Sequence, residues 1–339
     1  MPSKHLLTNI IKVSLLVLAA CAQKVDSSSS KSTGYEFIRD QSHTSSDSIC
    51  APGTFNAGIV GGEKVQKSSR LGRSVVFILQ NDAHHTSSCS GTLIDRNIIL
   101  TAAHCVDQSV NSPQNVSVYF SNQPDCDKVY EVLEPKKRLA EAIIIHPSWN
   151  SAGTHMIGHG DLALVRIEGN APASAQTIRL SSDFLMAPTV PVLLAGFGLV
   201  TPDYNETPTA PISLRAAFTH PITAEQRDHL ASLTSGDRNP SSLEQHEYDN
   251  LPSNELFYID QTHGDGICGG DSGGPSLIKN SNNDYVQVGV ASFVLNPYNI
   301  NLLCGYAGAH TNVLFMKDWI EKSFSQIKND YDFKDSPFQ

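Results

Sequence analysis

The chain has 339 residues, which is enough to bury one large core or two small β-barrels that share an interface. Hydrophobic residues make up 40% and charged residues 17% of the sequence, which excludes a disordered or fibrous chain. The formal net charge of −10 offers no basic surface and argues against non-specific binding to nucleic acid.

The first residues resemble an export signal. A basic start is followed by an apolar run at 13–20 that is too short to cross a membrane. The run ends in Leu-Ala-Ala-Cys, which is similar to the bacterial lipobox, in which Cys21 is lipidated and begins the mature chain. Ordinary signal cleavage after Ala22 is the alternative. We favour the lipobox and expect an extracytoplasmic protein that contacts a bacterial outer membrane only through a lipid on Cys21.

Residues 22–58 are rich in serine and are expected to form a linker and propeptide. Short β-branched runs then recur between turn signals and favour an all-β barrel or sandwich. These runs lie at 74–79, 98–100, 116–120, 162–167 and 190–194. A helix is expected only near the C-terminus, where apolar residues recur every three or four positions from Val313 to Phe324. Residues 329–339 form a polar tail.

Cysteine usage points to an oxidising compartment. Setting Cys21 aside leaves 7 − 1 = 6 cysteines, at positions 50, 89, 105, 126, 268 and 304. An even number in an exported chain predicts disulfides. Metal binding is the alternative, but the sequence has no Cys-x-x-Cys pair and no tight Cys/His cluster.

Three segments have the residue types needed for nucleophilic catalysis. Gly-Gly-Asp-Ser-Gly-Gly-Pro at 269–275 places Ser272 among glycines that permit a tight turn. Thr-Ala-Ala-His-Cys at 101–105 places His104 beside a cysteine, and Asp161 begins an apolar strand where an unpaired acid is costly. Taken singly, each has a plain structural interpretation: a glycine-rich turn, a structural histidine and an ordinary buried acid.

Together the segments resemble the trypsin/chymotrypsin family of serine proteases, from residue 59 to about 324. Ile-Val-Gly-Gly at 59–62, Cys-Ser-Gly-Thr-Leu-Ile at 89–94, Gly-Phe-Gly at 196–198 and Ser-Phe at 292–293 follow the family order. The resemblance implies a protease domain at 59–328 with two packed antiparallel six-stranded β-barrels, split near residue 175, and a C-terminal helix. It also implies a monomeric endopeptidase of protein or peptide substrates that needs no metal or organic cofactor.

The resemblance assigns roles to these residues. Ser272 is expected to attack the substrate carbonyl, His104 to act as base and then acid, and Asp161 to orient the imidazole. The backbone N–H groups of Gly270 and Ser272 are expected to form the oxyanion hole. Ser292 is expected to donate a hydrogen bond to Asp161.

The resemblance also implies an inactive precursor. Cleavage after Gly58 would free the amine of Ile59, which in the family pairs with the acid before the nucleophile, here Asp271. The three residues before the cut, Asn-Ala-Gly at 56–58, include no Arg or Lys, so self-cleavage or an activating protease with a small-residue preference is expected. Spacing, as in family bridges, suggests Cys89–Cys105 and Cys268–Cys304, and elimination leaves Cys50–Cys126.

The expected specificity pocket carries no charge. By the resemblance, Gly266 lies at its floor, Phe293 and Val294 form one wall, and Gly308 forms the other. Val294 should narrow the pocket, so small or medium uncharged residues are expected at the cleaved position. His310 lies behind the floor, either as a pocket histidine or, as we favour, as a core residue with its own partner.

Two other functions compete with proteolysis. A binding module could keep the protease fold for adhesion, but such proteins usually lose a triad residue. An esterase would also place its serine in Gly-x-Ser-x-Gly, but the order in this chain, with the histidine first, argues against it. His155 and His159 are spaced like a metal pair on a helix, but glycines around them favour a loop.

Overall fold

The computed structural model describes residues 58–81, 86–124, 136–149, 159–183, 187–200, 212–234, 254–295, 304–328 and 336–338. The predicted lipobox with Cys21, the linker, the predicted Cys50–Cys126 bridge and His155 lie outside these residues. Within the described ranges, no helix is long and apolar enough to span a membrane.

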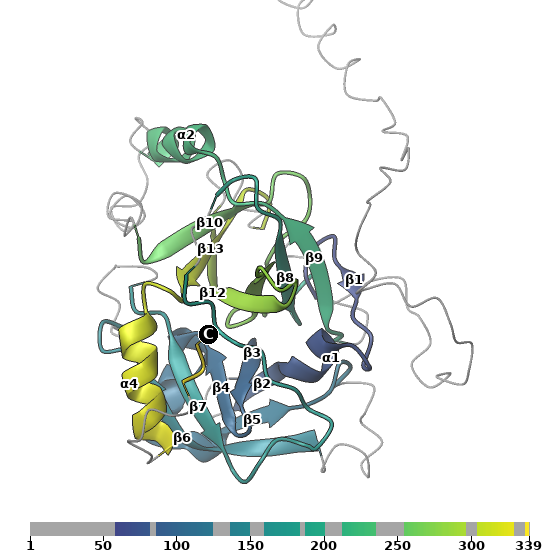
Figure 1. Cartoon of the computed structure of the whole chain (residues 1–339), viewed down its shortest axis with the longest axis vertical. Helices are drawn as coiled ribbons and strands as arrows, with labels where there is room; N and C mark the ends of the chain where they lie inside the picture. Colours follow the sequence, from purple (N-terminus) through teal and green to yellow (C-terminus); the bar gives the residue numbers. More distant parts are fainter. Residues whose placement is uncertain are drawn as a thin grey trace, which may run out of the picture. The chain divides into compact units, whose positions relative to one another are not determined.

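Six strands form a closed antiparallel barrel in the order β2-β3-β4-β7-β6-β5 (Figure 1). They are β2 (Val75–Asn81), β3 (Thr86–Asp95), β4 (Ile98–Thr101), β5 (Val116–Tyr119), β6 (Lys137–Ile145) and β7 (Ala163–Ile167). β4 and β7 are buried along almost their whole length because the barrel core covers one side of each and neighbouring segments cover the other. β-branched residues suit such strands.

The remaining strands form a second antiparallel sheet in the order β1-β9-β8-β11-β12-β13-β10. They are β1 (Glu63–Lys64), β8 (Val192–Gly196), β9 (Arg215–Thr219), β10 (Leu256–Asp260), β11 (Pro275–Lys279), β12 (Tyr285–Leu295) and β13 (Ala307–Asn312). The segment after β9 pairs with β10 through Pro221 and Ile259, which brings the ends of the six larger strands together. The short β1 is a seventh strand that the sequence did not predict.

Helix α4 (Lys317–Lys328) covers the first barrel beside β6 and β7 (Figure 1). Its face of Ile320, Phe324 and Ile327 joins the core of that barrel. Val313 and Met316, just before the helix, join the same core. The predicted all-β fold with two barrel-like sheets and a C-terminal helix is therefore confirmed.

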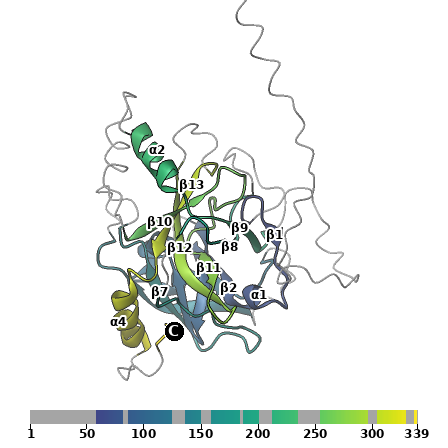
Figure 2. The same cartoon turned by 45° about the horizontal axis from the view of Figure 1, so that its top comes forward.

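Two further α-helices were not expected. α1 (Arg70–Ser74) begins at Ser69, whose hydroxyl accepts from Gly72 N. α2 (Ala224–Thr234) follows β9 and projects from the second sheet in both views (Figure 2). It begins with a reciprocal capping pair, since Thr223 N donates to Gln226 Oε1 at 2.8 Å and Gln226 N donates to Thr223 Oγ1 at 3.1 Å.

The two sheets meet along β3 and the loop before β11. Ser90 of β3 accepts a hydrogen bond from Phe197 N at 3.0 Å and donates its hydroxyl to Gly270 O at 3.1 Å. Three short 3-10 helices, η1 (Ala103–Cys105), η2 (Asp107–Ser109) and η3 (Pro113–Asn115), follow β4. His104 in η1 and Asp161 just before β7 belong to the first barrel, and Ser272 lies in the loop before β11 of the second sheet. The predicted triad therefore comes from both sheets.

Candidate active site

Asp161 lies just before β7 and accepts hydrogen bonds from both sheets. His104, in η1, donates its backbone N–H to Oδ1 at 3.0 Å, and its Nδ1 lies 2.8 Å from Oδ2. Ser292 of β12 donates its hydroxyl to Oδ2 at 2.5 Å. The carboxylate belongs to a residue that is only 2% exposed, so these donors take the place of water around it.

The aspartate and the imidazole stabilise each other's charge. Burial by itself lowers the pKa of His104, but the charge and hydrogen bond of Asp161 raise it more, and the net pKa lies above 6.5. Burial by itself raises the pKa of Asp161, but His104 and then Ser292 bring it below 3.8. Asp161 is therefore ionised at neutral pH and favours a proton on Nδ1 of His104, so in the neutral imidazole Nε2 is the nitrogen that can accept a proton.

Ser272 lies in the loop before β11 and contacts Ser292, which also binds Asp161. Its hydroxyl donates to Ser292 O at 3.4 Å, and its carbonyl accepts from Ser90 N at 2.8 Å. No hydrogen bond joins its Oγ to His104 within the described residues. Such contacts are often long without substrate and tighten in the complex. The next residue, Gly273, lies so close to Thr101 and Ser90 that a Cβ would overlap them.

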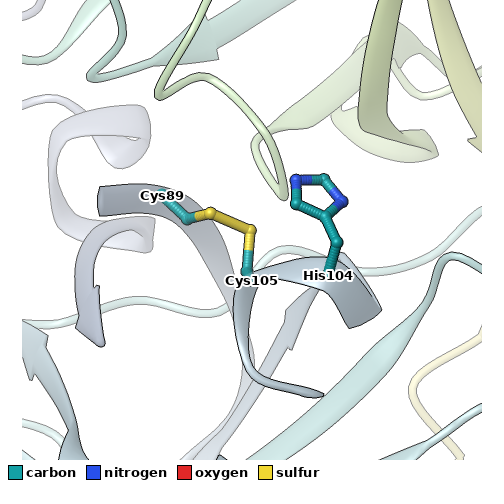
Figure 3. A group of neighbouring side chains, drawn as sticks. All are labelled: Cys89, His104 and Cys105. Atoms are coloured by element: carbon teal, nitrogen blue, oxygen red, sulfur yellow. A yellow bond between two sulfur atoms is a disulfide. The ribbon is translucent and has the colours of Figure 1, made fainter. Parts of the chain in front are cut away.

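The disulfide Cys89–Cys105 fixes η1 against β3 (Figure 3). Cys89, His104 and Cys105 have donor atoms close enough to suggest a metal site. Both sulfurs are bonded to each other, however, so neither is a thiolate that could bind a metal ion. The cluster therefore serves to position His104. The second suggested bridge, Cys268–Cys304, is also present and joins the loop of Ser272 to the start of the segment leading to β13.

Asp271 is a second buried carboxylate in the same loop. It is 0% exposed and accepts from Gly198 N at 2.7 Å and Cys268 N at 2.8 Å. Burial outweighs both hydrogen bonds and raises its pKa to about 7. Gly198 also contacts the predicted cleavage site, because its carbonyl accepts a hydrogen bond from Gly58 N.

The segment after the predicted cut is inserted into the protein. Ile59 is fully buried and belongs to the core of the second sheet. Val60 and Gly266 exchange two backbone hydrogen bonds, of 2.9 and 3.1 Å. Gly198 therefore contacts both Gly58 and Asp271.

Phe293, Val294 and Gly308, which were predicted to line the pocket, lie on two paired strands, and His310 lies in the core, the alternative favoured from the sequence. Phe293 and Val294 on β12 pair with Ala309 and Gly308 on β13. His310, in contrast, is a core residue: its Nδ1 lies 2.7 Å from Ser276 Oγ and its ring stacks on Phe257. Burial lowers its pKa to about 3, so it is neutral and is not accessible to a substrate.

Two residues that the sequence analysis missed hold the loop of Asp161 against the second sheet. Glu255, just before β10, accepts from Gly160 N at 2.5 Å, and its other oxygen lies 2.9 Å from Nδ1 of His159. Thr311 of β13 donates its hydroxyl to Asp161 O at 3.1 Å. Glu255 had a usable signal, since it is an acid at the start of an apolar strand, like Asp161.

The chain is similar to several known proteins. A family model described as Trypsin matches residues 59–320. Chymotrypsin-like elastase family member 1 of Bos taurus is 27% identical over 246 residues, which cover 70% of this chain and 80% of that protein. Chymotrypsin-C of Bos taurus is 27% identical over 243 residues, covering 70% of this chain and 79% of the relative.

The solved structure of HL collagenase has a similar fold. Its TM-score is 0.56 with 21% sequence identity, and the match covers 79% of this chain and 99% of that one. At this identity the likeness concerns the fold alone.

Proposed function

The chain belongs to the trypsin family of serine proteases, and from this membership we propose that it is an endopeptidase that hydrolyses peptide bonds through an acyl-enzyme. The observation that carries the proposal is the array in which His104 and Ser292, from different sheets, both bind the ionised Asp161. Ser272, which donates to the carbonyl of the same Ser292, lies beside this array.

In the proposed reaction the Ser272 oxygen bonds to the substrate carbonyl carbon while its proton passes to Nε2 of His104. The C–N bond then breaks, and His104 gives that proton to the departing amine. Water adds to the acyl-enzyme with the same help from His104 and restores the Ser272 hydroxyl. Asp161 stays ionised throughout and stabilises the imidazolium.

Two free backbone donors support an oxyanion hole. Gly269 O accepts from Leu199 N at 2.8 Å, and Asp271 O accepts from Gly274 N at 2.9 Å. Because N–H and C=O point in opposite directions across a trans peptide, the N–H groups of Gly270 and Ser272 point away from these partners. Within the described part of the chain neither N–H has an acceptor. Gly270 has φ of 95°, a conformation that favours glycine.

We further propose that the chain is a precursor activated by cleavage between Gly58 and Ile59. The position of Gly198 between Gly58 and Asp271 supports this, because a new amine on Ile59 would arise close to a carboxylate whose burial raises its pKa to about 7. An ion pair there would hold the loop of Ser272. Both Gly58 and Ile59 are buried, so the bond must leave this position before a protease can cut it.

The proposed substrates are proteins or peptides with a small or medium uncharged residue before the scissile bond. The pairing of Val294 with Gly308 supports a narrow pocket.

We also propose that the protein is exported and anchored by a lipid on Cys21. Loss of membrane association in a Cys21→Ala variant, measured by fractionation, would support the lipid, and unchanged association would oppose it.

The test of the proposed function is cleavage of a mixed peptide library by the purified protein cut at Gly58–Ile59, with the Ser272→Ala variant as control. We expect cleavage by the wild type alone, decreasing below a midpoint above pH 6.5, because His104 must be neutral to act as base. If neither protein cuts, and a serine-reactive fluorophosphonate labels neither, proteolysis is excluded and the binding module becomes the better interpretation.

A further inference from the structure

Gln261, directly after β10, is a buried glutamine whose side-chain amide is fixed by three hydrogen bonds. Its Nε2 donates to Ile267 O at 3.0 Å and to Cys304 O at 2.8 Å, and its Oε1 accepts from Ile267 N at 3.1 Å. The residue is 1% exposed, and its backbone N–H donates to Tyr306 O at 2.9 Å. Both amide protons are used, so the side chain has one defined position.

That position lies between the two glycines of the expected specificity pocket. A Cβ on Gly266 would come closer than 3.0 Å to Cγ, Cδ and Nε2 of Gln261, and a Cβ on Gly308 would come closer than 3.0 Å to Oε1. Neither glycine has positive φ. These positions therefore require glycine because a side chain would overlap Gln261, and not because of backbone conformation. The Gln261 side chain occupies the space that a side chain at either position would need.

We infer that Gln261 is a specificity-determining residue that fills the floor of the substrate pocket and restricts the cleaved position to short side chains. The inference rests on the proposed function and goes further, because it identifies what limits the depth of the pocket. Ile267 strengthens it, since a Cβ on Gly308 would also come closer than 3.0 Å to Cγ1 of that residue. Val294 would then restrict the width of the pocket and Gln261 its depth.

The lack of charge at the pocket floor predicts the same class of substrate. The amide is neutral, and its polar atoms are bonded to backbone groups, so it offers no carboxylate to a Lys or Arg side chain. The neighbouring Asp265 points elsewhere, because its Oδ1 lies where a Cβ on Gly61 would be. The floor therefore excludes long basic side chains both by shape and by lack of a charged partner.

The test compares matched peptides with Ala, Val, Leu or Met at the cleaved position, using the protein cut at Gly58–Ile59. Wild type is expected to prefer Ala to Met. Gln261→Ala is expected to raise kcat/KM for Met relative to Ala at least tenfold, because each added methylene in a pocket changes discrimination by about 10-fold or more. Val294→Gly alone is expected to leave the Met/Ala ratio below the Gln261→Ala value.

The matched control is Gln287→Ala, which removes another buried glutamine of the same sheet, one whose Nε2 donates to Gly289 O. It should not change the Met/Ala ratio. If Gln261→Ala does not fold, Gln261→Asn shortens the side chain by one methylene, keeps the amide, and should shift the ratio in the same direction. Unchanged ratios in every folded Gln261 variant, or a wild type that prefers Met, would overturn the inference while leaving proteolysis intact.

A second measurement does not depend on activity. Gly266→Ala is expected to lower the unfolding free energy more in the Ser272→Ala protein than in Ser272→Ala/Gln261→Asn, because the shorter side chain makes room for the new Cβ. Equal losses in both backgrounds would show that Gln261 does not occupy this space. This result separates failure of the inference from failure of the proposed protease activity.

Discussion

Asp161 and Asp271 are both buried carboxylates, but their surroundings give them opposite properties. Asp161 has an imidazole and a hydroxyl as partners, and its pKa lies below 3.8. Asp271 has only two backbone N–H donors among the described residues, and burial raises its pKa to about 7. Among the described residues, Asp161 has partners that stabilise its negative charge, and Asp271 has no cationic partner.

This difference suggests that Asp161 and Asp271 belong to two separate functions, proton transfer and activation. The groups that would move protons are assembled while Gly58 and Ile59 are still joined, because Asp161 is already held by residues of both sheets. The loop of Ser272, in contrast, contains the buried Asp271, which has no cationic partner in the part of the chain that the structure describes. A new amine on Ile59 would supply that cation, which turns a costly buried group into an ion pair. Under the proposed function, the Asp161 region would carry out catalysis and the Asp271 region would control activation.

The largest expected effect comes from the Asp161 side of the comparison. In the cleaved protein, Asp161→Asn should lower kcat about 10⁴-fold, because an amide favours the wrong tautomer of His104 while leaving the geometry intact. Asp284→Asn, at an exposed residue 4.0 Å from Arg70, is the control and should leave kcat unchanged. Retention of most of the activity in Asp161→Asn would contradict the role given to this carboxylate.

The next effect is a dependence of stability on pH that arises from Asp271. Its folded pKa of about 7 lies above the ordinary 3.8, so its contribution to stability is fully present below about pH 4 and is lost as the pH rises through 7. The change is on the order of 4 kcal/mol. Urea unfolding of the uncut Ser272→Ala chain, with and without Asp271→Asn, measures it between pH 4 and 8.

In that experiment the Asn variant should gain stability over the parent as the pH rises, because an amide does not ionise. A difference between the two proteins that is constant across the pH range would show that Asp271 is already compensated in the uncut chain. The distinction between the two carboxylates would then fail.

A smaller effect is expected from Ser292, which supports Asp161 from the second sheet. Ser292→Ala removes a hydrogen bond to a charged group, which typically contributes about 1.5–3 kcal/mol, so kcat/KM should fall about tenfold or more. Ser323→Ala, a buried serine of α4, is a matched control that should leave kcat/KM unchanged. Equal kcat/KM in the two variants would show that the hydrogen bond from Ser292 to Asp161 does not support catalysis.

The smallest effect is expected at Glu255, a positioning residue for the loop of Asp161. Glu255→Ala leaves Gly160 N without its acceptor and should lower kcat/KM severalfold. Glu255→Gln should restore most of it, since an amide oxygen can still accept from Gly160. If Glu255→Gln does not restore kcat/KM, the activity depends on the negative charge that faces His159 and not on the hydrogen bond to Gly160. The positioning role would then be wrong.

The sequence was most informative where function depends on neighbouring residues. His104 beside Cys105 and Ser272 among its glycines were visible because each motif is local. Glu255, Thr311 and Gln261 were missed, because each acts on a segment brought close only by strand pairing or by a buried side-chain contact.

Two structural features could not be predicted for a similar reason. The sequence assigned Gly266 and Gly308 to the expected pocket, but the Gln261 side chain that lies between them comes from the end of another strand. Helix α2 was missed although Thr223 and Gln226 have the spacing of a capping pair, because the helix lacks a clear apolar face.

The most direct test of the central claim is the rate at which a fluorophosphonate labels Ser272 before and after cleavage at Gly58–Ile59. Residues 54–58 would be replaced by the recognition sequence of a protease that leaves Ile59 as the new N-terminus. Cleavage should raise the labelling rate by about 10² or more, the typical value of an oxyanion donor, and Asp271→Asn should abolish the increase. An uncut chain that labels as fast as the cut one, or an Asp271→Asn variant that keeps the full increase, would contradict the account.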